Sequence, residues 1–133
     1  MLDVRIDDGI RYMDWIERNL AQAHRDETEA HWAGEVKLNR PLYRAVAAMG
    51  NLIFAGAFER GEPVGYCSAF LTPHPHYDCT VAQHDALFLL PPYRKGRTGL
   101  QLVSAVEREA ARLRAVRSSG FWRGAAGRKT WFI

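Results

Sequence analysis

The chain has 133 residues, of which 47% are apolar and 25% charged, as expected for one folded domain. No apolar stretch approaches the roughly 20 residues of a membrane-spanning helix, and the first residues lack the basic-then-apolar order of a signal peptide. The two cysteines are too few for a disulfide framework. We therefore expect a soluble, cytoplasmic protein with reduced thiols and no membrane partner.

The formal net charge of +3 originates at the end of the chain. Residues 117–133 contain no acid and four basic residues, Arg117, Arg123, Arg128 and Lys129. Subtracting these four from the 18 basic residues leaves 14, against 15 acidic ones, in the rest of the chain. A nucleic-acid surface is usually a broad basic patch. We therefore expect no nucleic-acid partner, with a contact between the tail and an acidic partner as the alternative.

The first half of the chain predicts one strand and two helices. Residues 2–6 alternate between apolar and polar, which predicts a strand. Over residues 10–23 the apolar residues recur at intervals of three and four, which predicts an amphipathic helix. Pro41 suits the first turn of a second helix, which we expect to end at Gly50.

The second half predicts three strands and a helix. Two apolar runs, 52–58 and 64–71, flank a Gly-Glu-Pro turn and predict an antiparallel hairpin. The Pro-His-Pro-His segment that begins at Pro73 is predicted to be irregular, because proline fixes φ and removes a donor. An apolar run at residues 82–90 predicts the third strand, and the periodicity of residues 99–113 predicts the last helix.

The order strand, helix, helix, three strands, helix indicates a single α+β domain of the three-layer type. We place this domain at residues 1–116. Residues 117–133 continue none of these patterns, and we expect them to form an atypical basic tail rich in glycine and arginine.

The segment with the clearest chemistry is the turn before the last helix, Arg94-Lys95-Gly96-Arg97-Thr98-Gly99. The first turn of a helix presents free N–H groups and the positive end of the helix dipole. Glycines let a ligand approach such a backbone closely. The turn therefore predicts a site for a pyrophosphate-like anion, and a purely structural turn with solvated arginines is the alternative.

This segment resembles the cofactor-binding motif of the GNAT acyltransferase superfamily, in which a fourth strand leads into an Arg/Gln-x-x-Gly-x-Gly/Ala loop and a long helix. Arg94 and Gly99 match the first and last positions of the loop. Arg97 stands in place of the middle glycine, and Gly96 comes one residue early. The stretch from His84 to Arg94 is similar to that of phage and bacterial members.

The resemblance covers residues 2–116. It implies a GNAT-like mixed, mostly antiparallel sheet flanked by helices, whose C-terminal part is incomplete. It also implies acetyl-CoA as co-substrate, without a metal, and direct transfer of the acetyl group to a primary amine. The implied cofactor-binding residues are Phe88, Leu89, Leu90, Arg94, Lys95, Gly96, Arg97, Thr98, Gly99 and Leu100.

Candidates for the base that accepts the proton of the amine are His84 and Asp85, and Glu35 is a further candidate. Successive strand residues point to opposite faces, so at most one of the two should face the cleft. The resemblance further implies an acceptor site bordered by Glu35, His76, Tyr77 and Asp78. The alternative for each is a solvated or hydrogen-bonded polar side chain.

A zinc site would need a spaced set of ligands. The residues of suitable type, His74, His76, Asp78, Cys79 and His84, match no recognised ligand spacing, and we predict no metal.

The end of the chain differs from the family pattern. A complete member continues with a fifth strand and commonly supplies a tyrosine that protonates the leaving thiolate, whereas residues 117–133 contain no tyrosine. An exposed strand edge invites pairing with another chain, and we predict a homodimer that completes the sheet. The alternative function is a catalytically inactive, phage-derived GNAT-like module that binds a protein partner.

Overall fold

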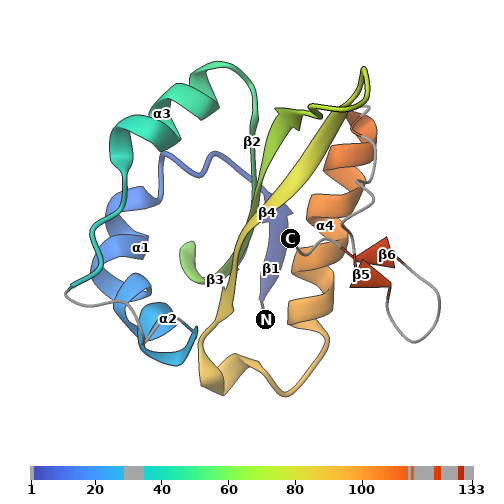
Figure 1. Cartoon of the computed structure of the whole chain (residues 1–133). Helices are drawn as coiled ribbons and strands as arrows, with labels where there is room; N and C mark the ends of the chain where they lie inside the picture. The colour runs from blue at the N-terminus through green and yellow to red at the C-terminus, as the bar shows by residue number, and fades with distance from the viewer. Residues whose placement is uncertain (1, 29–34, 114, 116–121, 124–128, 131–133) are drawn as a thin grey trace.

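The computed structural model describes residues 2–28, 35–113, 115, 122–123 and 129–130. A four-stranded antiparallel sheet separates two layers of helices (Figure 1). The predicted α+β, three-layer class is thereby confirmed. None of the helices in the described part of the chain is long and apolar enough to cross a membrane.

The strands follow one another across the sheet in the order β1-β2-β3-β4, and each neighbouring pair is antiparallel. Their bounds are Asp3–Ile6 for β1, Leu52–Glu59 for β2, Glu62–Pro73 for β3 and Thr80–Leu89 for β4. Two shorter strands, β5 (Trp122–Arg123) and β6 (Lys129–Thr130), form a separate two-stranded sheet.

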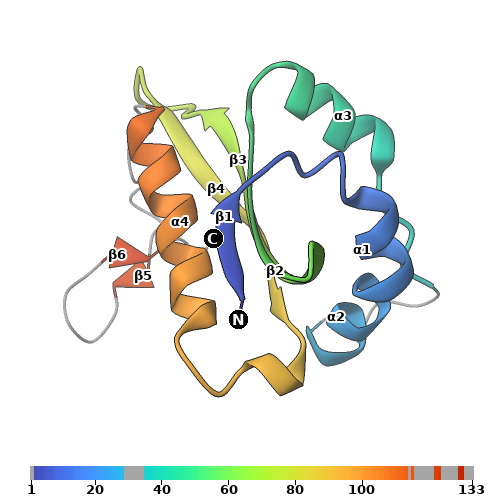
Figure 2. The same ribbon diagram turned by 180° about the vertical axis from the view of Figure 1, so that it is seen from behind.

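The helices lie on both faces of the larger sheet. Figures 1 and 2 show α4 against one face and α1, α2 and α3 against the other. Their bounds are Met13–Asn19 for α1, Ala21–Thr28 for α2, Arg40–Ala48 for α3 and Thr98–Arg112 for α4. A short 3-10 helix, η1 (Pro91–Tyr93), joins β4 to the turn before α4.

The prediction of one continuous helix in the first part of the chain is wrong. The apolar period from residue 10 to residue 23 predicts one helix, whereas the structure has two, separated at Leu20. Leu20 leaves the helical conformation, with φ −124°, and is 1% exposed in a cluster with Phe54 and Phe58. The bend brings the side chain of Leu20 into this core, so tertiary packing overrides the local period.

The predicted hairpin is confirmed, and its turn is tighter than expected. Glu59 pairs with Glu62, which leaves Arg60 and Gly61 as the two turn residues, with φ 52° and 82°. Positive φ at both central residues is the signature of a type I′ turn, which matches the twist of the flanking strands. The following Glu-Pro therefore belongs to β3 and not to the turn.

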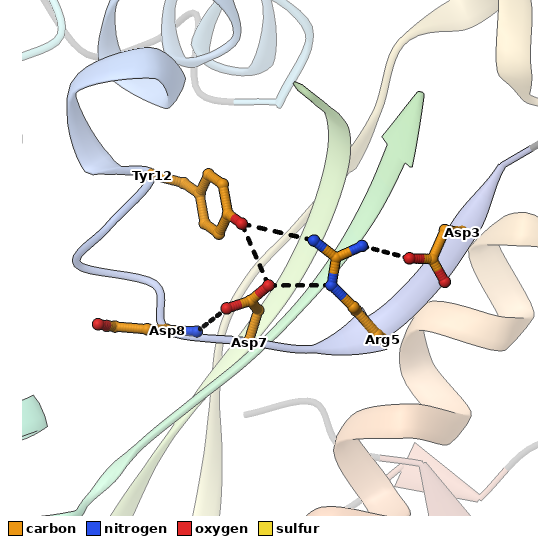
Figure 3. A network of polar contacts seen from close by, with 5 residues as sticks. All are labelled: Asp3, Arg5, Asp7, Asp8 and Tyr12. Carbon is orange, nitrogen blue, oxygen red and sulfur yellow. Dashed lines mark hydrogen bonds and ion pairs between the residues drawn. The ribbon is translucent and has the colours of Figure 1, made fainter. Parts of the chain in front are cut away.

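A polar network fixes the connection from β1 to α1 (Figure 3). Arg5 lies over the Phe58 ring at 3.8 Å, pairs with Asp3, and donates to the Oδ2 atom of Asp7 at 3.0 Å. Tyr12 donates to the same Asp7 oxygen at 3.1 Å. Burial opposes ionisation of Asp7, but the hydrogen bonds from the Asp8 N–H, Arg5 and Tyr12 outweigh it and hold the pKa below its usual value. The network thus links β1 to Tyr12, the residue just before α1.

Candidate active site

A β-bulge in β4 brings a carboxylate to the face of the sheet that α1–α3 cover. Ser68 of β3 is opposite Ala86, and Ala69 is opposite His84. Asp85 is therefore an additional residue in β4, with no residue of β3 opposite it in the register. Bulges often re-aim a side chain next to an active site. Here both Asp85 and Ala86 line a cavity on that face.

The Asp85 carboxylate is held in one orientation by two hydroxyl groups. Its Oδ2 atom accepts hydrogen bonds from Tyr43 of α3 at 2.8 Å and from Ser68 of β3 at 2.7 Å. Ser68 is 6% exposed, so its hydroxyl has little access to water. The Oδ1 atom accepts no hydrogen bond from the described residues, so it can receive a proton or a ligand N–H.

The cavity has a volume of about 590 Å³, within the roughly 300–1,000 Å³ usual for small-molecule sites. It lies between the sheet and the helices α1–α3, and its polar lining includes Asp85, Ser68, Tyr43 and Glu35. Two of the predicted site residues, Asp85 and Glu35, are therefore brought to one cavity.

Helix α3 covers the cavity without being part of a core, since none of its residues is buried. Ion pairs join its first residue, Arg40, to Asp14 and to Glu17 of α1, the latter at 2.9 Å. Glu17 also accepts from the Leu38 N–H at 3.0 Å. The hydrogen bonds from Arg40 lower the pKa of both acids. Polar contacts at its start and the Tyr43–Asp85 hydrogen bond thus hold α3 above the sheet.

His84 lies on the opposite face from Asp85. It borders a small space beneath α4 with Cys67, Val103 and Val106. Burial lowers the pKa of His84, an effect that the negative charge of Asp85 opposes. Burial also raises the pKa of Cys67 to about 12, which keeps this thiol protonated near neutral pH.

A histidine that the sequence analysis did not single out also lines the cavity. The Nδ1 atom of His24 in α2 lies 2.7 Å from the hydroxyl of Tyr66, and its ring stacks on Phe88 at 5.1 Å. The signal for His24 is its position four residues after Leu20 and eight after Ile16, on one stripe of the helical period. Tyr43 and Ser68 carry no comparable signal, because only the fold brings them to Asp85.

The turn before α4 is open to an anion. The helix begins at Thr98, no side chain caps it, and its first turn holds no acid. A Cβ atom added at Gly96 or Gly99 would meet no atom within 4 Å, so a ligand can reach the backbone there. Lys95 and Arg97 are exposed beside these N–H groups. The residues present therefore fit the pyrophosphate of acetyl-CoA.

Arg94 faces away from this open turn. Its Nε atom donates to the Leu89 carbonyl at 2.6 Å, and its guanidinium pairs with Glu27 of α2 at 2.7 Å and lies 5.5 Å from the centre of the Phe88 ring. The side chains of Phe88 and Leu89 are 3% and 7% exposed, in the cores on the two faces of the sheet. This part of β4 can offer a ligand its backbone more readily than its side chains.

The remaining predicted site residues lie apart from the cavity. Leu100, 66% exposed, and Arg97 border a groove between α4 and β1. His76, Tyr77 and Asp78 are exposed on the turn between β3 and β4 and do not line the cavity. Among the described residues, no three His, Cys, Asp or Glu side chains gather in a way that could hold a metal ion.

Solved structures with this fold include several acetyltransferases. One is an aminoglycoside acetyltransferase from an uncultured soil metagenomic sample, with TM-score 0.66, 18% identity and coverage of 88% of this chain and 76% of that one. A ribosomal-protein-alanine N-acetyltransferase from Brucella melitensis biovar Abortus has TM-score 0.66, 14% identity and the same coverage. A predicted acetyltransferase from Clostridium acetobutylicum, solved with acetyl-CoA, has TM-score 0.67, 12% identity and coverage of 88% and 78%.

The curated protein sequences include no match to the chain. The model of the acetyltransferase (GNAT) family, in contrast, matches residues 11–124, which is most of the chain and includes both the bulge and the basic turn. The resemblance inferred from the turn is thereby confirmed. The chain belongs to the acetyltransferase (GNAT) family.

Proposed function

We propose that this chain transfers the acetyl group of acetyl-CoA to a primary amine that binds in the cavity beside Asp85. The observation that carries this proposal is the position of Asp85, whose carboxylate lines a cavity of small-molecule size. Four residues after Asp85, the same strand ends and leads into the open basic turn at the start of α4. One strand therefore connects an acceptor site to a site for the donor.

Backbone groups of the protein bind most of the donor, acetyl-CoA. The first-turn N–H groups of α4 and the basic side chains of Lys95 and Arg97 hold the pyrophosphate. In the described part of the chain, β4 has a strand neighbour only on its β3 side, so its outer edge can pair with the amides of the pantetheine arm. Acetyl-CoA, when bound, supplies a thioester whose carbonyl carbon forms the new C–N bond as the C–S bond breaks.

Asp85 acts on the acceptor. Its Oδ1 atom attracts the protonated amine and takes one proton from it, directly or through a water molecule, which frees the nitrogen lone pair for attack. Tyr43 and Ser68 donate to Oδ2 and so keep Oδ1 directed to the amine. The second proton lost by the nitrogen goes to the departing sulfur, so that the products are an amide, CoA and one proton.

Calorimetry with acetyl-CoA tests the donor site. Wild type should bind saturably, and Gly99→Trp should not, because the indole would fill the open turn. Leu113→Trp places the same side chain just beyond the other end of α4 and should bind as wild type does. Absence of binding in wild type would overturn the proposal.

A transfer assay then tests the reaction. CoA release in the presence of a panel of primary amines, with mass spectrometry of the product, should show an acetylated amine. Acetyl-CoA binding without transfer to any amine would contradict the proposed reaction and favour the catalytically inactive module.

The homodimer stays a prediction. Its support is the part of the outer edge of β4 toward Thr80, since the pantetheine arm would occupy the end toward the basic turn. Light scattering over a range of protein concentrations should give a mass near twice the 15.1 kDa of one chain. A mass of one chain at every concentration would contradict it.

A further inference from the structure

The charges of the described residues that line the cavity balance one another. Among the described lining residues, Arg25 and Lys37 are cations and Glu35 and Asp85 are carboxylates, so the formal charge is zero when His24 is neutral. A ligand with several ammonium groups would meet as many cations as carboxylates in a partly enclosed space, where like charges repel strongly. The described part of the lining therefore offers a polycation no excess of carboxylates.

On the sheet side of the cavity, one group of polar side chains surrounds Asp85, and the neutral pair of His24 and Tyr66 lies apart from it. Asp85, Tyr43 and Ser68 form a single hydrogen-bonded cluster, and Asp85 is its one charged member. A small number of polar groups in a largely apolar pocket fixes the orientation of a ligand. This cluster suits one cationic nitrogen.

The walls around this cluster are apolar and partly aromatic. Met13 and Ile16 of α1 and Phe54 and Phe70 of the sheet line the cavity. Leu42 of α3 lines it too and is 48% exposed, because α3 buries none of its residues. A ligand with an apolar frame would cover Leu42 and remove that surface from water.

From these three observations we infer that the acceptor is a compact monoamine, with one cationic nitrogen on an aromatic or branched aliphatic frame. The nitrogen lies at Asp85, and the frame lies between α3 and the sheet, against Leu42 and Phe70. This inference rests on the proposed function, since it names the class of acceptor for the same cavity.

The first test compares acceptors. With acetyl-CoA as donor, kcat/KM for 2-phenylethylamine and isoamylamine should exceed kcat/KM for spermidine and kanamycin at least tenfold. Equal values, or a preference for the two polycations, would overturn the inference while leaving acetyl transfer to amines intact.

The second test changes the wall of the cavity. Leu42→Asp adds a carboxylate opposite the apolar frame and should lower kcat/KM for 2-phenylethylamine about tenfold. The value of kcat/KM for spermidine relative to that for 2-phenylethylamine should rise. Residue 42 lies in the first turn of α3, where an aspartate favours the helix, so the variant should fold. Met49→Asp is the matched control, since Met49 is 72% exposed, caps the same helix and does not line the cavity. Equal effects of the two variants would count against the inference.

Direct binding separates this inference from the proposed function. Calorimetry with 2-phenylethylamine alone, without a donor, should show saturable binding that Leu42→Asp weakens and Met49→Asp does not. If the chain failed to bind acetyl-CoA, the proposed function would fall and this measurement would still decide the inference. No amine binding, with or without acetyl-CoA, would overturn it.

Discussion

The two faces of the sheet are packed in opposite ways. On the face toward α4 the buried residues are mostly small or aliphatic, and they form one closed core, with Ala55, Ala57, Ala69 and Ala82 from the strands and Leu102 and Ala110 from the helix. On the face toward α1–α3 the buried residues are mostly aromatic, namely Phe54, Phe58, Tyr66 and Phe88, with Ile16 and Leu20.

The size of the side chains on each face explains why one face of the sheet is closely packed and the other holds a cavity. Small side chains let α4 approach the strands closely, and close packing leaves little empty volume. Large rings occupy only part of the opposite face, and beside them α3 rests on polar contacts and leaves a cavity of about 590 Å³. We infer that the face toward α4 carries most of the stability, whereas the face toward α1–α3 holds the cavity proposed as the acceptor site.

The strongest test of this comparison is a leucine truncation on each face. Leu102 of α4 is fully buried, and Leu102→Ala should lower the free energy of unfolding by about 2–5 kcal/mol. Leu42→Ala on the cavity face should change it by less than about 0.5 kcal/mol, since Leu42 is half-exposed. Urea unfolding followed by circular dichroism measures both. Equal losses would mean that the cavity face also carries stability.

Substitutions of two neighbouring residues on β4 should show which face of the sheet carries the proposed base. Asp85→Asn keeps an acceptor for Tyr43 and Ser68 but removes the base, and should lower kcat/KM for acetyl transfer about 100-fold, or about 2.7 kcal/mol of transition-state stabilisation. His84→Gln, on the α4 face, should change it less than about threefold, because His84 does not line the cavity. The reverse result would move the base to the α4 face.

An added methyl group should be tolerated only where the packing is open. A Cβ atom at Gly65 of β3 would lie 2.5 Å from the Leu89 Cδ1 atom and 2.8 Å from the Phe88 carbonyl oxygen. Gly65→Ala should therefore destabilise the chain by about 1–3 kcal/mol in urea unfolding. Gly96→Ala, which meets no atom, should be neutral within about 0.5 kcal/mol. Equal destabilisation by the two substitutions would contradict close packing at Gly65.

The smallest expected effect is a pH dependence from His84. Its pKa is lower in the folded chain than the usual value of about 6.5, so below that value the unfolded chain binds more protons. The stability contribution is complete above pH 6.5 and is lost as the pH falls toward the folded pKa. Between about pH 6.5 and 5, the wild type should lose more stability than His84→Gln in urea unfolding. Parallel curves for the two proteins would contradict a half-buried His84 whose pKa is lowered.

Much of the fold could be read from the chain because its cues are local. The apolar period predicts α4 over residues 99–113, and the structure has Thr98–Arg112. The prolines that follow β4 act on their own backbone and so mark the end of the strand directly. The turn between β2 and β3 is predicted in the right place, but at Gly-Glu-Pro and not at the Arg60-Gly61 pair that forms it. The continuous helix over residues 10–23 failed because the burial of Leu20 depends on strands more than 30 residues away.

The sequence by itself determined the class of fold, most of the order of its elements and a glycine-rich basic turn before α4, since hydrophobic period, turn residues and helix ends are properties of short segments. It also predicted that only one of the two candidates for the proposed base on β4, His84 or Asp85, faces the cleft, because side chains alternate along a strand. Only the tertiary structure showed that Asp85 is the one that lines the cavity. The bulge that places Asp85 in the cavity is a mismatch between β3 and β4, and the hydroxyls that orient Asp85 come from Tyr43 and Ser68, 42 and 17 residues away along the chain. Such a site is defined by distances between segments, which no local pattern records.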